Sequence, residues 1–202
     1  PEGRIQIDAL AERMKNEKLD AVYSSDLDRA YETALGVARY HPEITVEKIP
    51  GIREINPGIW EAMPMGELLR EYPREFNEFI TYKEDWHVEG AETFESLKQR
   101  VMAAVTQLAE KHDGQRIAIV SHGVTIRCIV AACQKKPMSE ALGLFVPKNT
   151  SINTIRYDNG EFEIVSLDDC AHVPTEFNGK KSRLREPGTA FCYENADPRK
   201  IK

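Results

Sequence analysis

The sequence lacks several features that would place it in a common class of protein. No apolar run approaches the ~18 consecutive residues of a membrane span, and no apolar signal-peptide stretch follows the first residues. Only 4 cysteines occur, none of them in a CxxC pair, and no histidines and cysteines have metal-ligand spacing. Positive charge is not in excess either, because 27 basic residues face 33 acidic ones and the net charge is −6.

These absences predict a cytoplasmic protein with reduced cysteines that spans no membrane and binds no nucleic acid. An anionic ligand would have to be held by a local cluster of cations and backbone amides, because the overall charge is negative. With 202 residues, 41% of them hydrophobic, the chain is long enough to bury roughly 70% of its unfolded surface in one domain.

Apolar residues recur with helical and strand periods in alternation along the chain. The clearest helical pattern covers 94–111, and Asn159-Gly160 predicts a tight hairpin turn between strands over 151–157 and 162–167. Strands that alternate with helices predict an α/β sandwich. The other predicted strands are 20–25, 44–49 and 116–121, and the other predicted helices are 7–18, 26–40, two within 66–82, and 124–133.

Two details of this pattern concern the sheet and the start of a helix. Segment 116–121 (RIAIVS) is apolar on both faces, which predicts a parallel strand in the interior of the sheet. Ser25 is the predicted N-cap of the helix over 26–40, with Asp28 three residues later in capping-box register.

The first candidate for chemistry is Ser121-His122-Gly123, which follows the strand over 116–121. Ligands of open α/β sheets bind beside the carboxyl ends of the strands, and the start of the following helix offers an anion site. An isolated histidine in such a turn is more often a core or turn residue without a role, so the candidate needs partners.

Two further stretches supply such partners. Arg29 stands in the first turns of the helix over 26–40, where the helix dipole disfavours a cation unless an anion such as phosphate binds there. Glu54 lies in segment 53–61 (REINPGIWE), among apolar and turn-forming residues, where a carboxyl can act as a general acid. A solvated Arg29 and a salt-bridged Glu54 are the alternatives.

Together these stretches resemble the histidine phosphatase superfamily, which has the phosphoglycerate mutase-like fold. The similarity runs in family order from residue 3 to residue 173, about 85% of the chain. The matching pieces are GRIQ (3–6), YSSDLDRAYETA (23–34), REINPGIWE (53–61), GAET (90–93), VSHGVTIR (120–127) and NTSINTIRYDNGEFEIVSLDDCAHV (149–173).

The resemblance implies a three-layer α/β/α sandwich with a mostly parallel sheet. It also implies a phosphatase that hydrolyses small phosphate monoesters through a phosphohistidine intermediate, with no metal or other cofactor. The expected partner is a small phosphorylated metabolite, and a homodimer is the alternative to a monomer. Two further matching residues, Glu92 and Asn149, would support the site.

The resemblance also assigns roles to the candidate residues. Arg29, His122 and Gly123 would bind the phosphoryl group, with the backbone amide of Val124 as a weaker addition. His122, positively charged, would stabilise the transition state. Glu54 would protonate the leaving group and later deprotonate the attacking water.

One part of the family pattern is missing from the sequence. The family's nucleophile is a histidine in an Arg-His-Gly motif at the end of a first strand, ahead of GRIQ, and no histidine of this chain precedes Arg29. Either residues are omitted, or the protein is a catalytically inactive binder of phosphate ligands. We favour omission, because two apolar sheet edges would otherwise stay unpaired, at on the order of 1–3 kcal/mol for each buried unsatisfied group. The histidines are His41, His87, His112, His122 and His172.

Residues 1–173 are therefore predicted to form the histidine phosphatase domain without its first strand and following loop, and 174–202 a tail, lid or arm. The short segment between Glu54 and Gly90 favours a phosphatase over the alternative, a cofactor-dependent phosphoglycerate mutase. The residues predicted to line the substrate pocket are Arg70, Tyr72, Arg74, Tyr82, Lys83 and Trp86.

Overall fold

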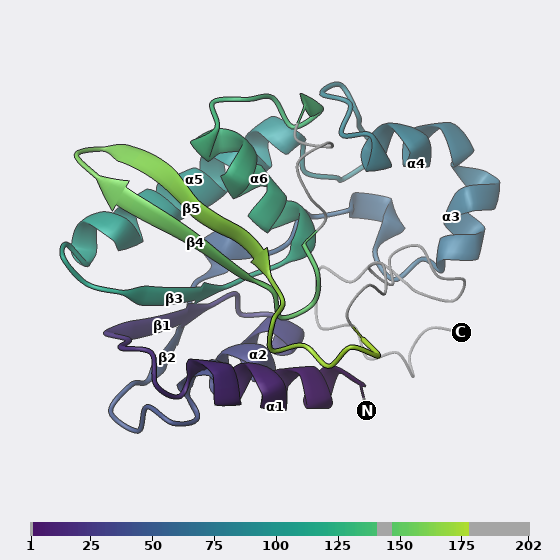
Figure 1. Cartoon of the computed structure of the whole chain (residues 1–202). Coiled ribbons are helices and arrows are strands. Elements are labelled where there is room, and N and C mark those ends of the chain that lie inside the picture. Colours follow the sequence, from purple (N-terminus) through teal and green to yellow (C-terminus); the bar gives the residue numbers. More distant parts are fainter. Residues whose placement is uncertain (1, 141–146, 178–202) are drawn as a thin grey trace.

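The computed structural model describes residues 2–140 and 147–177 (Figure 1). Most of the predicted tail, 178–202, lies outside the described residues. No helix in the described ranges combines the length and the apolar character that crossing a bilayer requires. The helices are α1 (Glu2–Met14), α2 (Asp28–Ala38), α3 (Met65–Glu71), α4 (Pro73–Ile80), α5 (Phe94–Lys111) and α6 (Gly123–Cys133), with 3-10 turns at Pro50–Ile52 and Gly58–Trp60.

The strands form two separate groups. β1 (Ala21–Ser24) is the middle strand of a parallel sheet with the order β2-β1-β3, where β2 is Val46–Lys48 and β3 is Ile117–Val120. β4 (Ile152–Asp158) and β5 (Glu161–Asp169) form an antiparallel hairpin on the other side of β3 from β1 (Figure 1). Its turn residues, Asn159 and Gly160, both have positive φ, so the predicted hairpin is confirmed.

Helices cover both faces of the parallel sheet, as the predicted α/β sandwich requires. Ala118 and Val120 of β3 pack in one cluster with Leu10 of α1 and Val37 of α2. Ile119, which points to the opposite face, packs in the second cluster, to which α5 and α6 contribute. The alternation of side chains along β3 therefore feeds both layers.

β3 lies at the edge of its sheet, so the prediction of an interior strand is wrong within the described residues. There β3 pairs with β1 alone, and all four of its residues are partly exposed. In β1, by contrast, three of four residues are buried. The apolar run of β3 reflects the helices above and below it, and sequence does not report what lies beside a strand within the sheet.

An aromatic cluster packs α3 and α4 beside the sheet. Trp86 lies 5.4 Å from Trp60 and 4.8 Å from Phe79 between ring centroids. The hydroxyl of Tyr82 accepts a hydrogen bond from the buried Arg127 at 2.9 Å. Tyr82 and Trp86 are thus core residues, and none of the six predicted pocket residues lines the cavity that holds the candidate site.

Candidate active site

The carboxylate of Glu54 is held at the amino end of α6. Backbone N–H groups donate to it from Val124 (3.1 Å), Thr125 (3.0 Å) and Ile55 (3.1 Å), and the Thr125 hydroxyl donates at 3.0 Å. A helix amino end is a natural site for an anion. The Val124 amide thus donates to Glu54, and the phosphate contact that the resemblance implied for this amide stays a prediction.

Arg100 of α5 fixes the backbone that carries Glu54. Its guanidinium donates to the carbonyl oxygens of Gly51 (3.0 Å), Arg53 (3.2 Å) and Glu54 (3.4 Å). Glu92 binds the same guanidinium through both carboxylate oxygens, at 2.9 and 2.7 Å. Glu92 thus acts on Glu54 through Arg100, in line with the supporting position that the resemblance implied for it.

A second ion pair joins the loop of Glu54 to the start of α2. Arg53 donates from Nε and Nη2 to the two carboxylate oxygens of Asp26, each at 2.6 Å. The Arg53 guanidinium holds the pKa of Asp26 below its usual range. Because Asp26 lies two residues ahead of α2, this pair fixes the position of the helix that carries Arg29 relative to Glu54.

His122 is buried at the amino end of α6, with Nε2 2.8 Å from the hydroxyl of Ser25. Burial, and secondly the charge of Arg29, lower the pKa of His122 to about 3. The imidazole is therefore neutral at pH 7 in the ligand-free protein, and the positive charge expected of His122 in the transition state stays a prediction. Ser25 is not the N-cap either, because α2 begins at Asp28 with Leu27 at that position.

Three of the four predicted phosphate contacts line one cavity, and Val124 does not. Arg29, Glu54, His122 and Gly123 line a single cavity of about 1960 Å³, and Asn149, ahead of β4, lines it too. Arg29 is exposed on the first turn of α2. The cavity therefore brings a cation, an imidazole and a carboxylate to the carboxyl ends of β1 and β3.

The other histidines with hydrogen bonds lie away from Glu54. His112 lies at the amino end of β3, where its ring contacts the hydroxyl of Tyr23 at 2.7 Å. His41 Nε2 lies 3.1 Å from the carbonyl oxygen of Met14. In residues 2–140 and 147–177, no group of three His, Cys, Asp or Glu side chains could hold a metal ion.

Sequence reasoning missed three residues of this site: Ser25, Arg100 and Thr125. The hydroxyl run before α2 was a signal for Ser25, which was assigned to capping instead. Arg100 carried no usable signal, because it is one of several charged residues on α5 and the carbonyl oxygens it binds are 46–49 positions away.

The buried His122 should make the protein sensitive to acid. Its folded-state pKa is about 3 and the unfolded value is about 6.5, so between these pH values the unfolded chain binds a proton that native His122 does not. The free energy of unfolding is therefore complete above about pH 6.5 and falls as the pH drops towards 3. We expect His122→Asn, which cannot take up that proton, to lose less stability between pH 7.5 and 4.5 than the unmodified chain. Urea unfolding at both pH values measures this, and equal losses would contradict it.

Comparison with known families identifies the family of this chain. The sequence model of the histidine phosphatase superfamily (branch 1) matches residues 1–170. The chain belongs to the histidine phosphatase superfamily. The family and fold that the motifs predicted are thereby confirmed.

Relatives of this histidine phosphatase include named enzymes. The chain is 32% identical to the metal-independent phosphoserine phosphatase of Arabidopsis thaliana, over 85% of this chain and 71% of that protein. It is 28% identical to phosphoserine phosphatase 1 of Hydrogenobacter thermophilus, over 87% and 78%. The solved structure of Bacillus stearothermophilus YhfR superimposes with a TM-score of 0.81 at 28% identity, over 86% and 85% of the two chains.

Proposed function

We propose that this histidine phosphatase hydrolyses small phosphate monoesters of alkyl alcohols, phosphoserine among them, through a phosphohistidine intermediate. The observation that carries the proposal is the shared cavity of Arg29, Glu54 and His122. Two relatives named as phosphoserine phosphatases, one of them metal-independent, support the substrate class.

Three residues of the cavity, Arg29, His122 and Glu54, have defined tasks in the first step. Arg29 and the neutral His122 bind phosphoryl oxygens, and the charge of Arg29 stabilises the transition state. A nitrogen of the nucleophilic histidine, a different residue from His122, forms a bond to phosphorus as the ester P–O bond breaks. The departing alkoxide takes its proton from Glu54, which lies beside Gly123 at the rim of the same cavity.

The second step reverses the role of Glu54. As a carboxylate, which the four donors around it stabilise, Glu54 takes a proton from water. The water oxygen bonds to phosphorus, the P–N bond breaks, and inorganic phosphate leaves. Two moderate barriers thus replace a single high one.

The nucleophile can be tested separately from the rest of the site. Among the described histidines only His112 and His122 line the cavity, and the imidazole of His122 is engaged with Ser25. Free imidazole is small enough to enter the cavity and act as a substitute nucleophile. We expect the 202-residue chain to hydrolyse p-nitrophenyl phosphate at a rate that rises with imidazole concentration and survives excess EDTA.

Arg29 supplies the matched comparison for this assay. Arg29→Ala should lower the imidazole-dependent rate by about 10²-fold, because a charge aimed at the transition state is lost. Arg39→Ala, at the opposite end of α2 and outside the cavity, should leave the rate unchanged. Equal rates in Arg29→Ala and the unmodified chain would contradict the proposed site.

A further inference from the structure

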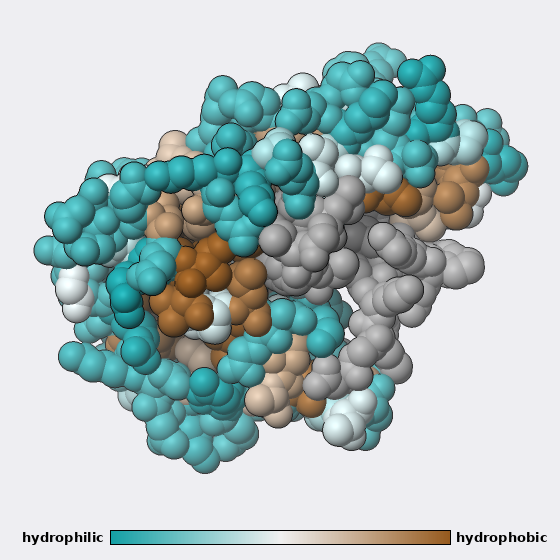
Figure 2. All heavy atoms as spheres, turned by 45° about the horizontal axis from the view of Figure 1, so that its top comes forward, coloured by the Kyte–Doolittle hydropathy of each residue, from teal (hydrophilic) through white to brown (hydrophobic). Residues whose placement is uncertain are grey.

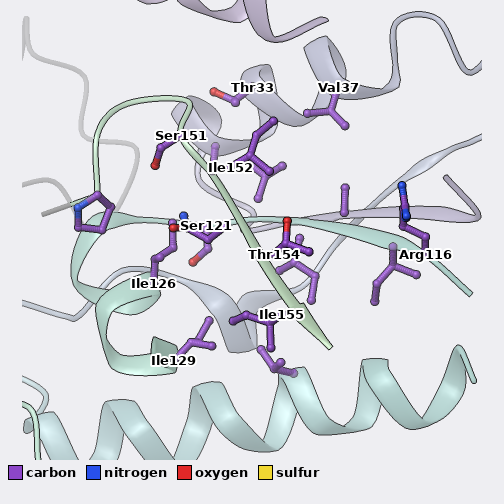
Figure 3. A pocket seen from close by; sticks show the side chains of 18 of the residues that line it. Thr33, Val37, Arg116, Ser121, Ile126, Ile129, Ser151, Ile152, Thr154 and Ile155 are labelled. Atoms are coloured by element: carbon purple, nitrogen blue, oxygen red, sulfur yellow. The ribbon is translucent and has the colours of Figure 1, made fainter. Parts of the chain in front are cut away.

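His122 stands between two elements that border the cavity. In Figure 3, Ser121 marks the end of β3 and Ile126 the first turn of α6, and His122 follows Ser121 in the chain. Figure 2 shows a hollow in the surface that is lined with hydrophobic side chains. A hydrogen bond in apolar surroundings is stronger than one in water, so the direction of each donor and acceptor near the phosphoryl site matters.

The side chain of His122 is not used to cap α6. The residue has the N-cap position with an extended backbone (φ −128°, ψ 169°), but within the described chain its ring makes no capping hydrogen bond. The N–H groups of Val124 and Thr125, which a capping side chain would normally bind, donate to Glu54 instead. The imidazole therefore makes its contacts away from the helix.

One ring nitrogen of His122 contacts a serine behind the cavity. Nε2 lies 2.8 Å from the hydroxyl oxygen of Ser25, which is fully buried and does not belong to the described lining of the cavity. Nδ1, by contrast, is not among the fully buried atoms of the described chain that lack a partner. The Nε2 side of the ring thus faces away from the cavity, and Nδ1 is the polar atom left for a ligand.

The Ser25 hydroxyl has a single proton, and its surroundings decide where that proton points. The backbone N–H of Leu27 donates to the hydroxyl oxygen at 3.4 Å, so the oxygen already accepts one hydrogen bond. Among the described residues, Nε2 of His122 is the acceptor within reach of the hydroxyl proton. If Nε2 were protonated, two N–H groups would face the oxygen and the hydroxyl proton would be buried without a partner, which is unfavourable.

We propose that Ser25 is a positioning residue that fixes the tautomer of His122: the hydroxyl donates to Nε2, and the imidazole carries its proton on Nδ1. The N–H group at Nδ1 then binds an oxygen of the phosphoryl group beside Arg29. The tautomer follows from the contacts of Ser25 alone, whereas the phosphoryl contact rests on the proposed function.

The neutral charge of His122 makes the tautomer decisive for binding. Neutral imidazole has one N–H group and one lone pair, and the oxygens of a phosphoryl dianion only accept hydrogen bonds. In the opposite tautomer a lone pair would face those oxygens and repel them. Ser25 therefore makes a neutral ring a donor at the place where the ligand's charge lies.

The same tautomer excludes two other roles for His122. Its lone pair is on Nε2, where the Ser25 hydroxyl binds it, and Nδ1 has no lone pair to offer. His122 therefore neither attacks phosphorus nor takes a proton from water while this hydrogen bond is intact. It acts as a ligand of the phosphoryl group, and the proton transfers belong to Glu54.

NMR measures the tautomer directly in the ligand-free chain. Protonated and unprotonated imidazole nitrogens have well separated 15N chemical shifts, and their couplings to the ring protons tell Nδ1 from Nε2. In the 202-residue chain labelled with 15N-histidine, we expect Nδ1 of His122 to be protonated and Nε2 unprotonated at pH 7. The signals missing from His122→Asn identify the ring. An unprotonated Nδ1 in the unmodified chain would overturn the proposal.

Two adjacent serines provide a matched pair of variants. Ser24 is as buried as Ser25, but its hydroxyl donates to the carbonyl oxygen of Ser25, at 2.7 Å. Ser25→Ala should leave His122 as a mixture of both tautomers with averaged 15N shifts, whereas Ser24→Ala should keep the proton on Nδ1. Ser25→Thr, which retains a hydroxyl, should restore the single tautomer. Equal His122 spectra in Ser24→Ala and Ser25→Ala would overturn the proposal.

Binding of inorganic phosphate connects the tautomer with the site. Ser25→Ala should weaken phosphate binding about three- to tenfold, because only a fraction of the molecules then presents the N–H group to the ligand. Ser24→Ala should stay within about 1.5-fold of the unmodified chain, because the tautomer of His122 is unchanged. Isothermal titration calorimetry at pH 7 measures both. Equal phosphate affinities of the two variants would contradict the role of Ser25 in binding.

Turnover separates this inference from the proposed function. The spectra require no substrate, so a chain with the expected tautomer in every variant would support the role of Ser25 whatever its activity. If that chain showed no imidazole-dependent hydrolysis of p-nitrophenyl phosphate, the phosphohistidine mechanism would be contradicted and the tautomer would stand. Hydrolysis with Nε2 protonated would do the reverse.

Discussion

Replacement of Glu54 by glutamine should lower the imidazole-dependent rate of O-phosphoserine hydrolysis by about 10²–10⁴-fold. The serine alkoxide is a poor leaving group, so its departure depends on the proton that Glu54 donates. p-Nitrophenolate leaves without a proton, so the same variant should affect p-nitrophenyl phosphate much less. Steady-state kinetics with both substrates measure this difference.

Glu89→Gln is a suitable control, because Glu89 is an exposed carboxylate close to the same loop. We expect its kinetics to match those of the unmodified chain with both substrates. Circular dichroism of Glu54→Gln tests whether the amino end of α6 still folds without the carboxylate. Equal losses with both substrates would show that Glu54 acts by charge or position, and would contradict its role as the acid.

Local patterns predicted the local structure well. The helix over 94–111 was predicted with the bounds it has, because a long apolar stripe and the following Gly114 define both ends. The hairpin followed from Asn159-Gly160, whose residues adopt the required positive φ. α1 was predicted at 7–18 and lies at Glu2–Met14, because its first turns are polar and show no period in the sequence.

Two residues of the candidate site could be predicted from their place after strand ends. His122 comes directly after β3, and Arg29 shortly after β1, so topology alone brings them together. The neutral charge of His122 depends on burial, and the role of Arg100 depends on packing between distant segments. The edge position of β3 was equally hidden, because its composition reflects the helices on its two faces.

Replacement of Arg100, which holds the backbone of Glu54, should have the second large effect. Arg100→Met should lower the free energy of unfolding by about 2–4 kcal/mol, because it leaves the carboxylate of Glu92, 11% exposed, without its ion-pair partner. It also leaves three carbonyl oxygens of the Glu54 loop without their donor. Gln99→Met, at the exposed residue just before Arg100 on α5, should change stability by less than about 0.5 kcal/mol.

Kinetics distinguish a positioning role of Arg100 from a purely structural one. If Arg100 positions Glu54, then Arg100→Met should lower kcat for O-phosphoserine more than for p-nitrophenyl phosphate even at temperatures where the variant is fully folded. Arg100→Lys keeps the charge but cannot reproduce the forked contacts, so its kcat for O-phosphoserine should lie between those of Arg100→Met and the unmodified chain. Added guanidinium ion should restore part of the phosphoserine rate in Arg100→Met by entering the vacated space beside Glu92. A variant that is less stable yet retains the full kcat for both substrates would show that Arg100 only stabilises the fold, because Glu54 would then keep its position without Arg100.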